Sequence, residues 1–130
     1  MSSYSFLNWL DFELAIKTLY DKYKNNTYNG IYGVPRGGLV LAIKLSHLLN
    51  IPLLIKPDKK GLWIDDIIDS GKTFEKYKNS SKDYCCWIAR KNNNLYYNIE
   101  INQNWIVFPW ESDKKKQILK DKELYVNRFN

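Results

Sequence analysis

Short apolar runs alternate with amphipathic segments along most of this chain of 130 residues. We predict strands at residues 31–34, 51–55, 62–64 and 83–89, and helices at 8–24, 38–49 and 73–78. Further on, we predict a loop at 92–94, a short strand within 98–107 and a basic, weakly amphipathic helix after Glu111. The predicted strands are almost continuously apolar, which is typical of a parallel sheet covered by helices on both faces. The alternation therefore predicts an α/β fold with a Rossmann-like parallel sheet flanked by helices.

Length and composition restrict the class of protein further. A chain of this length builds one core, so we expect a single domain spanning 1–130. No apolar run approaches the roughly 20 residues of a membrane span, and the N-terminus lacks the pattern of a secretory signal. Cys85 and Cys86 are adjacent and poorly placed to bridge each other. We expect a cytoplasmic protein in a reducing compartment.

Acidic residues cluster at the end of the third predicted strand. Asp65 and Asp66 follow apolar residues directly, and Asp69 stands three residues further on. Carboxylates in this position can accept hydrogen bonds from sugar hydroxyls or hold a hard cation. The turn at 70–73 then offers backbone amides and hydroxyls that can cradle a phosphate. Together these features indicate a site for a ribose 5-phosphate.

These residues also allow other interpretations. Gly71-Lys72-Thr73 also ends a Walker A motif, but that motif needs a glycine where Asp66 stands. The aspartates could be ordinary turn or cap residues, which would leave the apolar pair between Asp66 and Asp69 unexplained. The formal charge of +6 suggests a polyanion such as nucleic acid, yet the distinctive residues are acids at a strand end.

The segment 62–73 resembles the signature of type I phosphoribosyltransferases, which binds 5-phosphoribosyl-1-diphosphate (PRPP); only Gly61, just before it, departs from the pattern. The resemblance implies that Asp65 and Asp66 bind the ribose hydroxyls and that Asp66 contacts Mg²⁺. It also implies that Asp69 is the general base near the acceptor. The residues that it assigns to PRPP within this segment are Asp65, Asp66, Ile67, Ile68, Asp69, Ser70, Gly71, Lys72 and Thr73.

A second stretch resembles the pyrophosphate-binding loop of the bacterial xanthine–guanine phosphoribosyltransferases. Arg36-Gly37-Gly38 follows the first predicted strand and keeps the Arg-Gly-Gly of that family. The resemblance implies that Arg36 and Gly37 contact the pyrophosphate of PRPP. It also implies a cis peptide bond before the arginine, here between Pro35 and Arg36.

The C-terminal third resembles the hood of the same enzymes, at about residues 92–112. By position, Trp105 would stack on a purine and Ile106 would contact it through its backbone. Arg90 stands where those enzymes carry a lysine that donates to the 6-oxo group of the purine. The resemblance therefore implies that Asp69, Arg90, Trp105 and Ile106 bind the base.

One part of the resemblance is missing. These enzymes carry a long flexible loop between the second and third core strands, whereas only about six residues, 56–61, join them here. Lys56, Lys59 and Lys60 are candidates to replace part of its charge. We expect slow turnover, or closure of the site by a partner subunit.

The predicted function is transfer of the phosphoribosyl group of PRPP to a 6-oxopurine (guanine, xanthine or hypoxanthine), with release of pyrophosphate, in purine salvage. Mg²⁺ is the expected cofactor, and we expect a homo-oligomer, a dimer or tetramer, with no nucleic-acid or membrane partner. The alternative is a catalytically weak regulatory module that binds PRPP or a nucleotide. The short loop favours the alternative, and the base-stacking tryptophan favours the enzyme.

Overall fold

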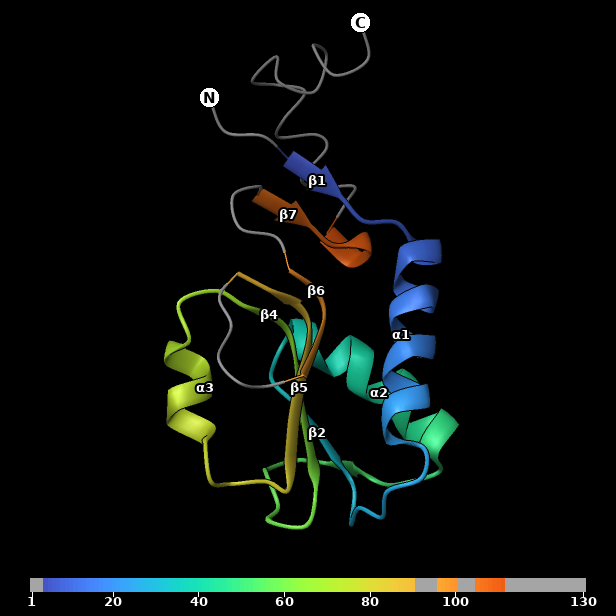
Figure 1. Cartoon of the computed structure of the whole chain (residues 1–130), viewed down its shortest axis with the longest axis vertical. Helices are drawn as coiled ribbons and strands as arrows, with labels where there is room; N and C mark the ends of the chain where they lie inside the picture. Colours follow the sequence, from blue (N-terminus) through green and yellow to red (C-terminus); the bar gives the residue numbers. More distant parts are fainter. Residues whose placement is uncertain (1–3, 91–95, 101–104, 112–130) are drawn as a thin grey trace, which may run out of the picture. The chain divides into compact units, whose positions relative to one another are not determined.

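A computed structural model describes residues 4–90, 96–100 and 105–111 of the chain. The chain forms two compact units: one spans Leu14–Asn102, and the other combines Met1–Glu13 with Gln103–Asn130. In its described part, the first unit contains a five-stranded sheet in the order β3-β2-β4-β5-β6, in which every neighbouring pair is parallel (Figure 1). The strands are β2 (Ile31–Gly33), β3 (Leu53–Leu54), β4 (Leu62–Ile68), β5 (Asp83–Ala89) and β6 (Tyr96–Glu100). This arrangement confirms the predicted parallel α/β fold.

Among the residues that the structure describes, three helices accompany this sheet: α1 (Trp9–Tyr23), α2 (Gly37–Leu49) and α3 (Lys72–Tyr77). Figure 1 shows α3 on one side of the sheet, with α1 and α2 on the other. α2 packs against β2 and β4 through Leu41, Ala42 and Leu45, which are buried. Both faces of the sheet are therefore covered, which explains why the central strands are mostly apolar.

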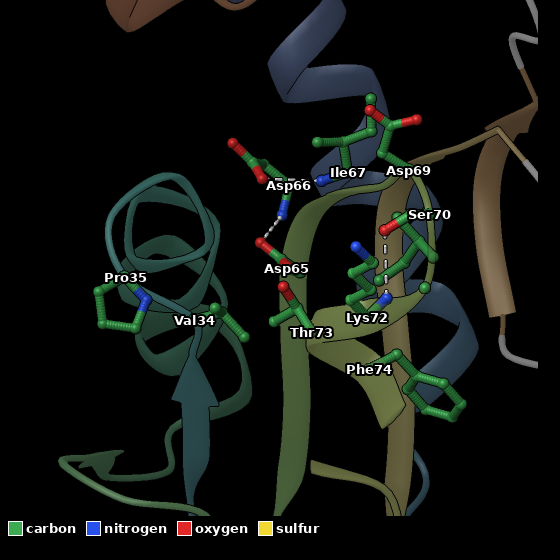
Figure 2. Close-up of a pocket in the computed structure, with 12 residues that line it drawn as sticks. Val34, Pro35, Asp65, Asp66, Ile67, Asp69, Ser70, Lys72, Thr73 and Phe74 are labelled. Carbon is green, nitrogen blue, oxygen red and sulfur yellow. Dashed lines mark hydrogen bonds between the residues drawn. The ribbon is translucent and has the colours of Figure 1, made fainter. Parts of the chain in front are cut away.

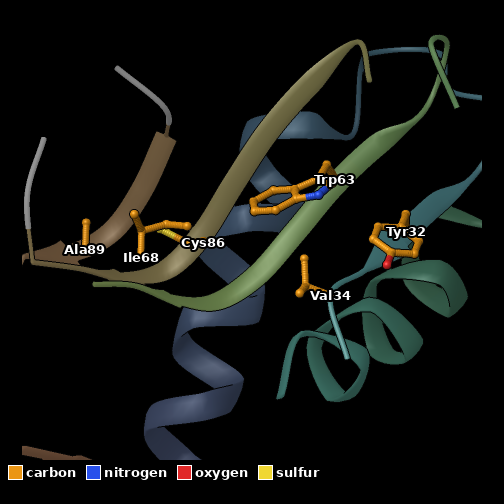
Figure 3. Close-up of a cluster of buried hydrophobic side chains, with 6 residues drawn as sticks. All are labelled: Tyr32, Val34, Trp63, Ile68, Cys86 and Ala89. Atoms are coloured by element: carbon orange, nitrogen blue, oxygen red, sulfur yellow. The ribbon is translucent and has the colours of Figure 1, made fainter. Parts of the chain in front are cut away.

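Figure 3 shows a cluster of buried side chains on the central strands, and Phe74 and Tyr77 of α3 pack against this cluster. Trp63 is fully buried and contacts the rings of Phe74 and Tyr77 on α3. Fully burying a large apolar side chain contributes on the order of 1.5–3 kcal/mol. Cys86 belongs to the same cluster, and it and Cys85 are free thiols. The core therefore anchors the end of β4 and the start of α3, from which the candidate site is built.

The second unit contains a small parallel pair, β1 (Tyr4–Phe6) with β7 (Trp105–Val107), followed by the 3₁₀ turn Pro109–Glu111. Trp9, Phe12 and Trp110 contact one another through their rings, and Trp110 stacks on Phe108. The sequence did not predict β1, because three residues give too short a pattern to distinguish a strand from a loop.

Several predicted boundaries differ from the structure. The segment 51–55 was expected to be a buried strand, but β3 covers two residues at the sheet edge and Ile55 is 96% exposed. An edge strand has one partner, here β2, so its apolar residues are not enclosed. Residues 98–107 were expected to carry one strand; they contribute to β6 and β7, in different sheets. The loop predicted at 92–94 and the helix predicted after Glu111 lie outside the described residues.

Within the described part of the chain, no helix is long and apolar enough to span a lipid bilayer.

Candidate functional site: the carboxyl edge of the sheet

Two turns meet at the carboxyl edge of the sheet. One follows β2 and leads into α2; the other follows β4 and leads into α3. They enclose a cavity of about 270 Å³ (Figure 2). In open parallel sheets, ligands usually bind outside the carboxyl ends of the strands. The cavity is lined by Val34, Pro35, Asp65, Asp66, Ile67, Ile68, Asp69, Ser70, Gly71, Lys72, Thr73 and Phe74.

The turn after β2 depends on glycine because it runs very close to β4. A Cβ added to Gly37 would overlap a carboxylate oxygen of Asp66, and one added to Gly38 would lie 2.7 Å from the carbonyl oxygen of Ile64. The peptide bond between Pro35 and Arg36 is cis, as the resemblance implied. Arg36 is exposed beside this contact. Arg36 and Gly37 therefore flank the cavity rather than line it.

The sequence had suggested that Asp65 and Asp66 follow the strand, but they lie within the last part of β4. The strand continues to Ile68, which pairs with Ala89 of β5. The Asp66 amide donates a 2.8 Å hydrogen bond to Asp65 Oδ1, and the Ile67 amide donates one of 2.8 Å to Asp66 Oδ1. These local bonds hold both carboxylates at the floor of the cavity.

The two carboxyl groups have different environments. Asp65 is 8% exposed, whereas Asp66 is half-buried. Burial, assisted by the hydrogen bond to Asp66 and by the charge of Asp66, raises the pKa of Asp65 to about 8. Burial therefore favours the protonated form of Asp65 more than that of an exposed aspartate. A bound cation would favour the ionised form of both carboxyl groups and relieve the repulsion between them, so this pair is suited to binding a cation.

The turn after β4 places polar groups along one wall of the cavity. Gly71 has φ of 87°, a left-handed conformation that favours glycine. The Lys72 amide donates to Ser70 Oγ at 3.3 Å. The amides of Thr73 and Phe74 belong to the first turn of α3, where the helix itself supplies no acceptor for them. The predicted residues Asp65 to Thr73 thus all line one cavity.

Asp69 forms an ion pair with Arg90. Arg90 Nε lies 3.1 Å from Asp69 Oδ1, and the Arg90 amide donates to the Ile68 carbonyl at 2.9 Å. Two residues that were predicted separately from the sequence are therefore in direct contact. Arg90 does not line the cavity, and it reaches the cavity through Asp69.

Three cavity residues were missed by the sequence analysis: Val34, Pro35 and Phe74. Each adjoins a predicted motif residue in the sequence, and this adjacency is the signal that could have identified them. Trp105 and Ile106, predicted to bind a base, lie in β7 of the second unit. Trp105 is 53% exposed and Ile106 is buried.

The connector between β3 and β4 ends at the opposite edge of the sheet. The Lys60 carbonyl accepts a 2.9 Å hydrogen bond from the Asn29 amide, and the Lys60 amide donates to Asp58 Oδ1 at 2.7 Å. Gly61 leads directly into the amino end of β4. Lys59 and Lys60 therefore lie beside the amino end of β4, at the edge of the sheet away from the cavity. The idea that they replace the charge of the missing loop is wrong, because the short connector has no length to return to the carboxyl edge.

The donor set fits magnesium held jointly with a phosphorylated ligand. Among the described residues, no group of three or more His, Cys, Asp or Glu side chains is arranged to hold a metal ion alone. Mg²⁺ is usually bound by one or two carboxylates together with water and substrate phosphates. The half-buried Asp66 offers such a carboxylate at the cavity.

Solved structures provide the comparison with known proteins, since no protein-family model and no curated protein sequence matches the chain. A purine phosphoribosyltransferase from Pyrococcus horikoshii Ot3 is 29% identical, with a TM-score of 0.72 over 84% of this chain and 94% of that one. The xanthine-guanine-hypoxanthine phosphoribosyltransferase of Helicobacter pylori is 19% identical, with a TM-score of 0.70 over 88% and 98%. A hypothetical protein from Neisseria gonorrhoeae, solved with bound ppGpp, is 17% identical, with a TM-score of 0.69 over 98% of each chain. The chain has the type I phosphoribosyltransferase fold.

Proposed function

We propose that the chain transfers the 5-phosphoribosyl group of PRPP to a 6-oxopurine and releases pyrophosphate. One observation carries the proposal: the Asp65–Asp66 pair lies between two turns, with Asp66 against Gly37 on one side and the Ser70–Thr73 turn on the other. PRPP has a ribose diol between a 5-phosphate and a pyrophosphate. A carboxylate pair flanked by two amide-bearing turns is complementary to that order of groups.

The proposed roles follow from this match. The turn from Ser70 to Thr73 holds the 5-phosphate. Ile67 and Ile68 bind PRPP through their backbone, which connects the aspartates to this turn. Asp65 and Asp66 accept hydrogen bonds from the ribose hydroxyls. The amides around Arg36 and Gly37 bind the pyrophosphate and stabilise the charge that it gains as it leaves.

Charge development explains why acids surround the ribose. The bond between C1 and the pyrophosphate oxygen breaks while a ring nitrogen of the base bonds to C1, and positive charge builds on the ribose. The carboxylates of Asp65 and Asp66 would stabilise that charge. Asp66 would hold Mg²⁺, which supplies Lewis-acid neutralisation of the pyrophosphate when bound. Asp69 accepts the proton that the base loses.

The acceptor base would bind beside Asp69. Asp69 and Arg90 are in contact near the carboxyl ends of β4 and β5. We propose that they bind the edge of the purine, that Trp105 stacks on its face and that Ile106 contacts it through the backbone. The Pyrococcus horikoshii protein, a purine phosphoribosyltransferase by name, supports a purine as the acceptor.

A second candidate is a regulatory module of the same fold that binds PRPP or a nucleotide without efficient transfer. The position of the β3–β4 connector favours it, because a loop that closes over the cavity excludes water and strengthens the electrostatic contacts inside. The Neisseria gonorrhoeae protein of this fold binds ppGpp.

Nucleotide formation separates the two candidates. The full chain is incubated with PRPP, Mg²⁺ and guanine, xanthine, hypoxanthine or adenine, and nucleotide and pyrophosphate are quantified. The enzyme is expected to form nucleotide with the 6-oxopurines, and product should disappear when EDTA is added. Tight PRPP binding with no product from any base would reject the enzyme and support the regulatory module.

A further inference from the structure

Aromatic rings supplied by the sheet hold α3 in place. The helix has six residues, and none of them is buried. A helix of this length is not stable alone in water, so contacts outside the helix must fix it. The Phe74 ring lies 6.0 Å from that of Trp63 and 5.3 Å from that of Tyr84, measured between centroids. The Tyr77 ring lies 6.0 Å from that of Trp63. Both aromatic residues of α3 therefore rest on Trp63.

Trp63 is the middle member of a row of three aromatic residues across the sheet. Tyr32 of β2 and Tyr84 of β5 pair with Trp63 in register, so the three side chains point to the same face. The Tyr32 hydroxyl lies 3.3 Å from that of Tyr77, and the Tyr84 hydroxyl donates to the Tyr77 carbonyl at 3.2 Å. The outer members thus fix the end of α3, and the fully buried Trp63 supports its middle.

Phe74 joins this aromatic row to the cavity. It lines the cavity and directly follows the turn from Ser70 to Thr73. The Glu75 amide donates to the Gly71 carbonyl at 2.9 Å, which ties the turn to α3. The position of the turn therefore follows the position of the helix.

We propose that Trp63 is a positioning residue: acting through Phe74, it holds the turn from Ser70 to Thr73 where a ligand phosphate binds. This inference rests on the proposed function, which assigns the 5-phosphate of PRPP to that turn. Trp63 touches no ligand, because it is fully buried and does not line the cavity. Its loss should weaken the binding of a 5-phosphate and leave the binding of pyrophosphate, at the turn after β2, unchanged.

The Trp63 indole offers a way to separate positioning from stability. Its Nε1–H has no hydrogen-bond partner among the residues that the structure describes. An unpaired buried donor is unfavourable, so Trp63→Phe removes that cost and keeps an aromatic ring against Phe74. Trp63→Leu also removes the donor but loses the ring contacts. The two variants therefore differ mainly in their support of α3.

The test uses Trp63→Leu and Trp63→Phe, with Trp87→Leu as the matched control. Trp87 is also fully buried, in β5, but it does not belong to the cluster against which Phe74 and Tyr77 pack. Dissociation constants of GMP, guanosine, PRPP and magnesium pyrophosphate are measured by calorimetry. The ratio of the constants for guanosine and GMP, the proposed product, isolates the contribution of the 5′-phosphate. Amide hydrogen exchange of the ligand-free proteins reports the order of residues 70–78.

Trp63→Leu is expected to reduce this ratio about tenfold to 100-fold, which is the effect of losing one hydrogen bond to a charged phosphate. PRPP affinity should fall by a similar factor, whereas the affinities for guanosine and magnesium pyrophosphate should stay within about twofold. Exchange at 70–78 should become faster, and exchange at 34–39 should not change. Trp63→Phe should restore most of the ratio, and Trp87→Leu should leave it unchanged.

An equal loss for guanosine and GMP would overturn the proposal, as would the same loss in Trp87→Leu, because either result reports a general loss of stability. If Trp63→Leu does not fold, Phe74→Leu removes the same ring contact from the side of the helix. It should give the same loss of the phosphate contribution, and an unchanged ratio would reject the positioning role.

Hydrogen exchange separates this result from the proposed function. If the wild type binds neither PRPP nor GMP, the proposed function fails and exchange alone decides on Trp63. Faster exchange at 70–78 in Trp63→Leu but not in Trp87→Leu would then support the positioning of the turn. Unchanged exchange at 70–78 in Trp63→Leu would overturn it.

Discussion

The two edges of the parallel sheet differ in how their connections are built. At the carboxyl edge, glycines let the turn after β2 approach β4 so closely that Gly37 contacts Asp66, and a cavity forms beside the contact. At the amino edge, the end of the β3–β4 connector is bonded to the neighbouring loop through Asn29 and Lys60. The carboxyl edge presents carboxylates and backbone amides to the cavity, whereas backbone groups at the amino edge are hydrogen-bonded to each other.

This difference separates ligand binding from closure of the site. The groups proposed to hold PRPP come from the turns after β2 and β4 and lie within one unit of the chain. The segment that should close over them is short and ends at the far edge. We therefore expect PRPP binding to be better preserved than rapid turnover. Substitutions at the two edges should have clearly different effects.

The largest difference is expected for the aspartates. Asp69→Asn at the carboxyl edge removes the proposed general base and should lower kcat by about 10²–10⁴-fold, with PRPP affinity retained. Asp58→Asn is the matched change at the amino edge, where Asp58 accepts from the Lys60 amide. It should leave kcat within about twofold. Steady-state kinetics with guanine measures both, and an active Asp69→Asn enzyme would remove this residue from its role.

Glycine substitutions should give the next largest difference. The added methyl group of Gly37→Ala would overlap Asp66, so the turn must move away from β4. We expect PRPP affinity to fall on the order of 100-fold, which corresponds to about 2.7 kcal/mol. At Gly61, an added Cβ would lie a tight 3.1–3.2 Å from its neighbours and require shifts of a few tenths of an ångström, but these neighbours do not line the cavity, so Gly61→Ala should leave PRPP affinity nearly unchanged. Calorimetric titration with PRPP and Mg²⁺ measures both, and equal losses would contradict the account.

The buried acid of the carboxyl edge should make stability depend on pH. The pKa of Asp65 is raised to about 8 in the folded protein, from 3.8. Between these values the folded state binds more protons than the unfolded state, so stability falls as pH rises from about 4 to 8. Asp65→Asn should remove at least about 1 kcal/mol of this dependence. Urea unfolding in EDTA at pH 5 and pH 8 tests this, and parallel curves for the two proteins would refute it.

The smallest difference is expected for the lysines. Lys72 lines the cavity, and removing its charge in Lys72→Gln should weaken PRPP binding about fivefold, because a solvated charge near a phosphate contributes roughly 1 kcal/mol. Lys59→Gln, at the amino edge, should change PRPP affinity by less than about twofold. The same titration distinguishes them. A larger effect of Lys59→Gln than of Lys72→Gln would show that the β3–β4 connector takes part in PRPP binding.

The sequence predicted the central part of the fold well, because β2, β4 and β5 are buried on both faces and their apolar runs have no competing interpretation. The strand at Asp83–Ala89 was predicted to the residue. The edge strand β3 was overestimated, since an apolar pattern does not report how many partners a strand has. β1 was missed because its three residues are ordered by pairing with β7, a contact distant in sequence.

The site was predictable where its residues are contiguous. The motif from Asp65 to Thr73 lines one cavity, as the resemblance implied. The contact of Gly37 with Asp66 and that of Arg90 with Asp69 could not be read from the sequence, because each joins residues from different turns. The connector leads into the amino end of β4, away from the cavity. This position, which corrects the role suggested for Lys59 and Lys60, follows from the direction of the strands.

Amide hydrogen exchange of the full chain, with and without PRPP and Mg²⁺, tests the central claim most directly. The account predicts slower exchange in residues 34–39 and 65–74 on PRPP binding, with residues 56–61 unchanged. Gly37→Ala should lose this protection in both segments together. Protection of 56–61, or of only one of the two carboxyl-edge segments, would contradict a single PRPP site at the carboxyl edge.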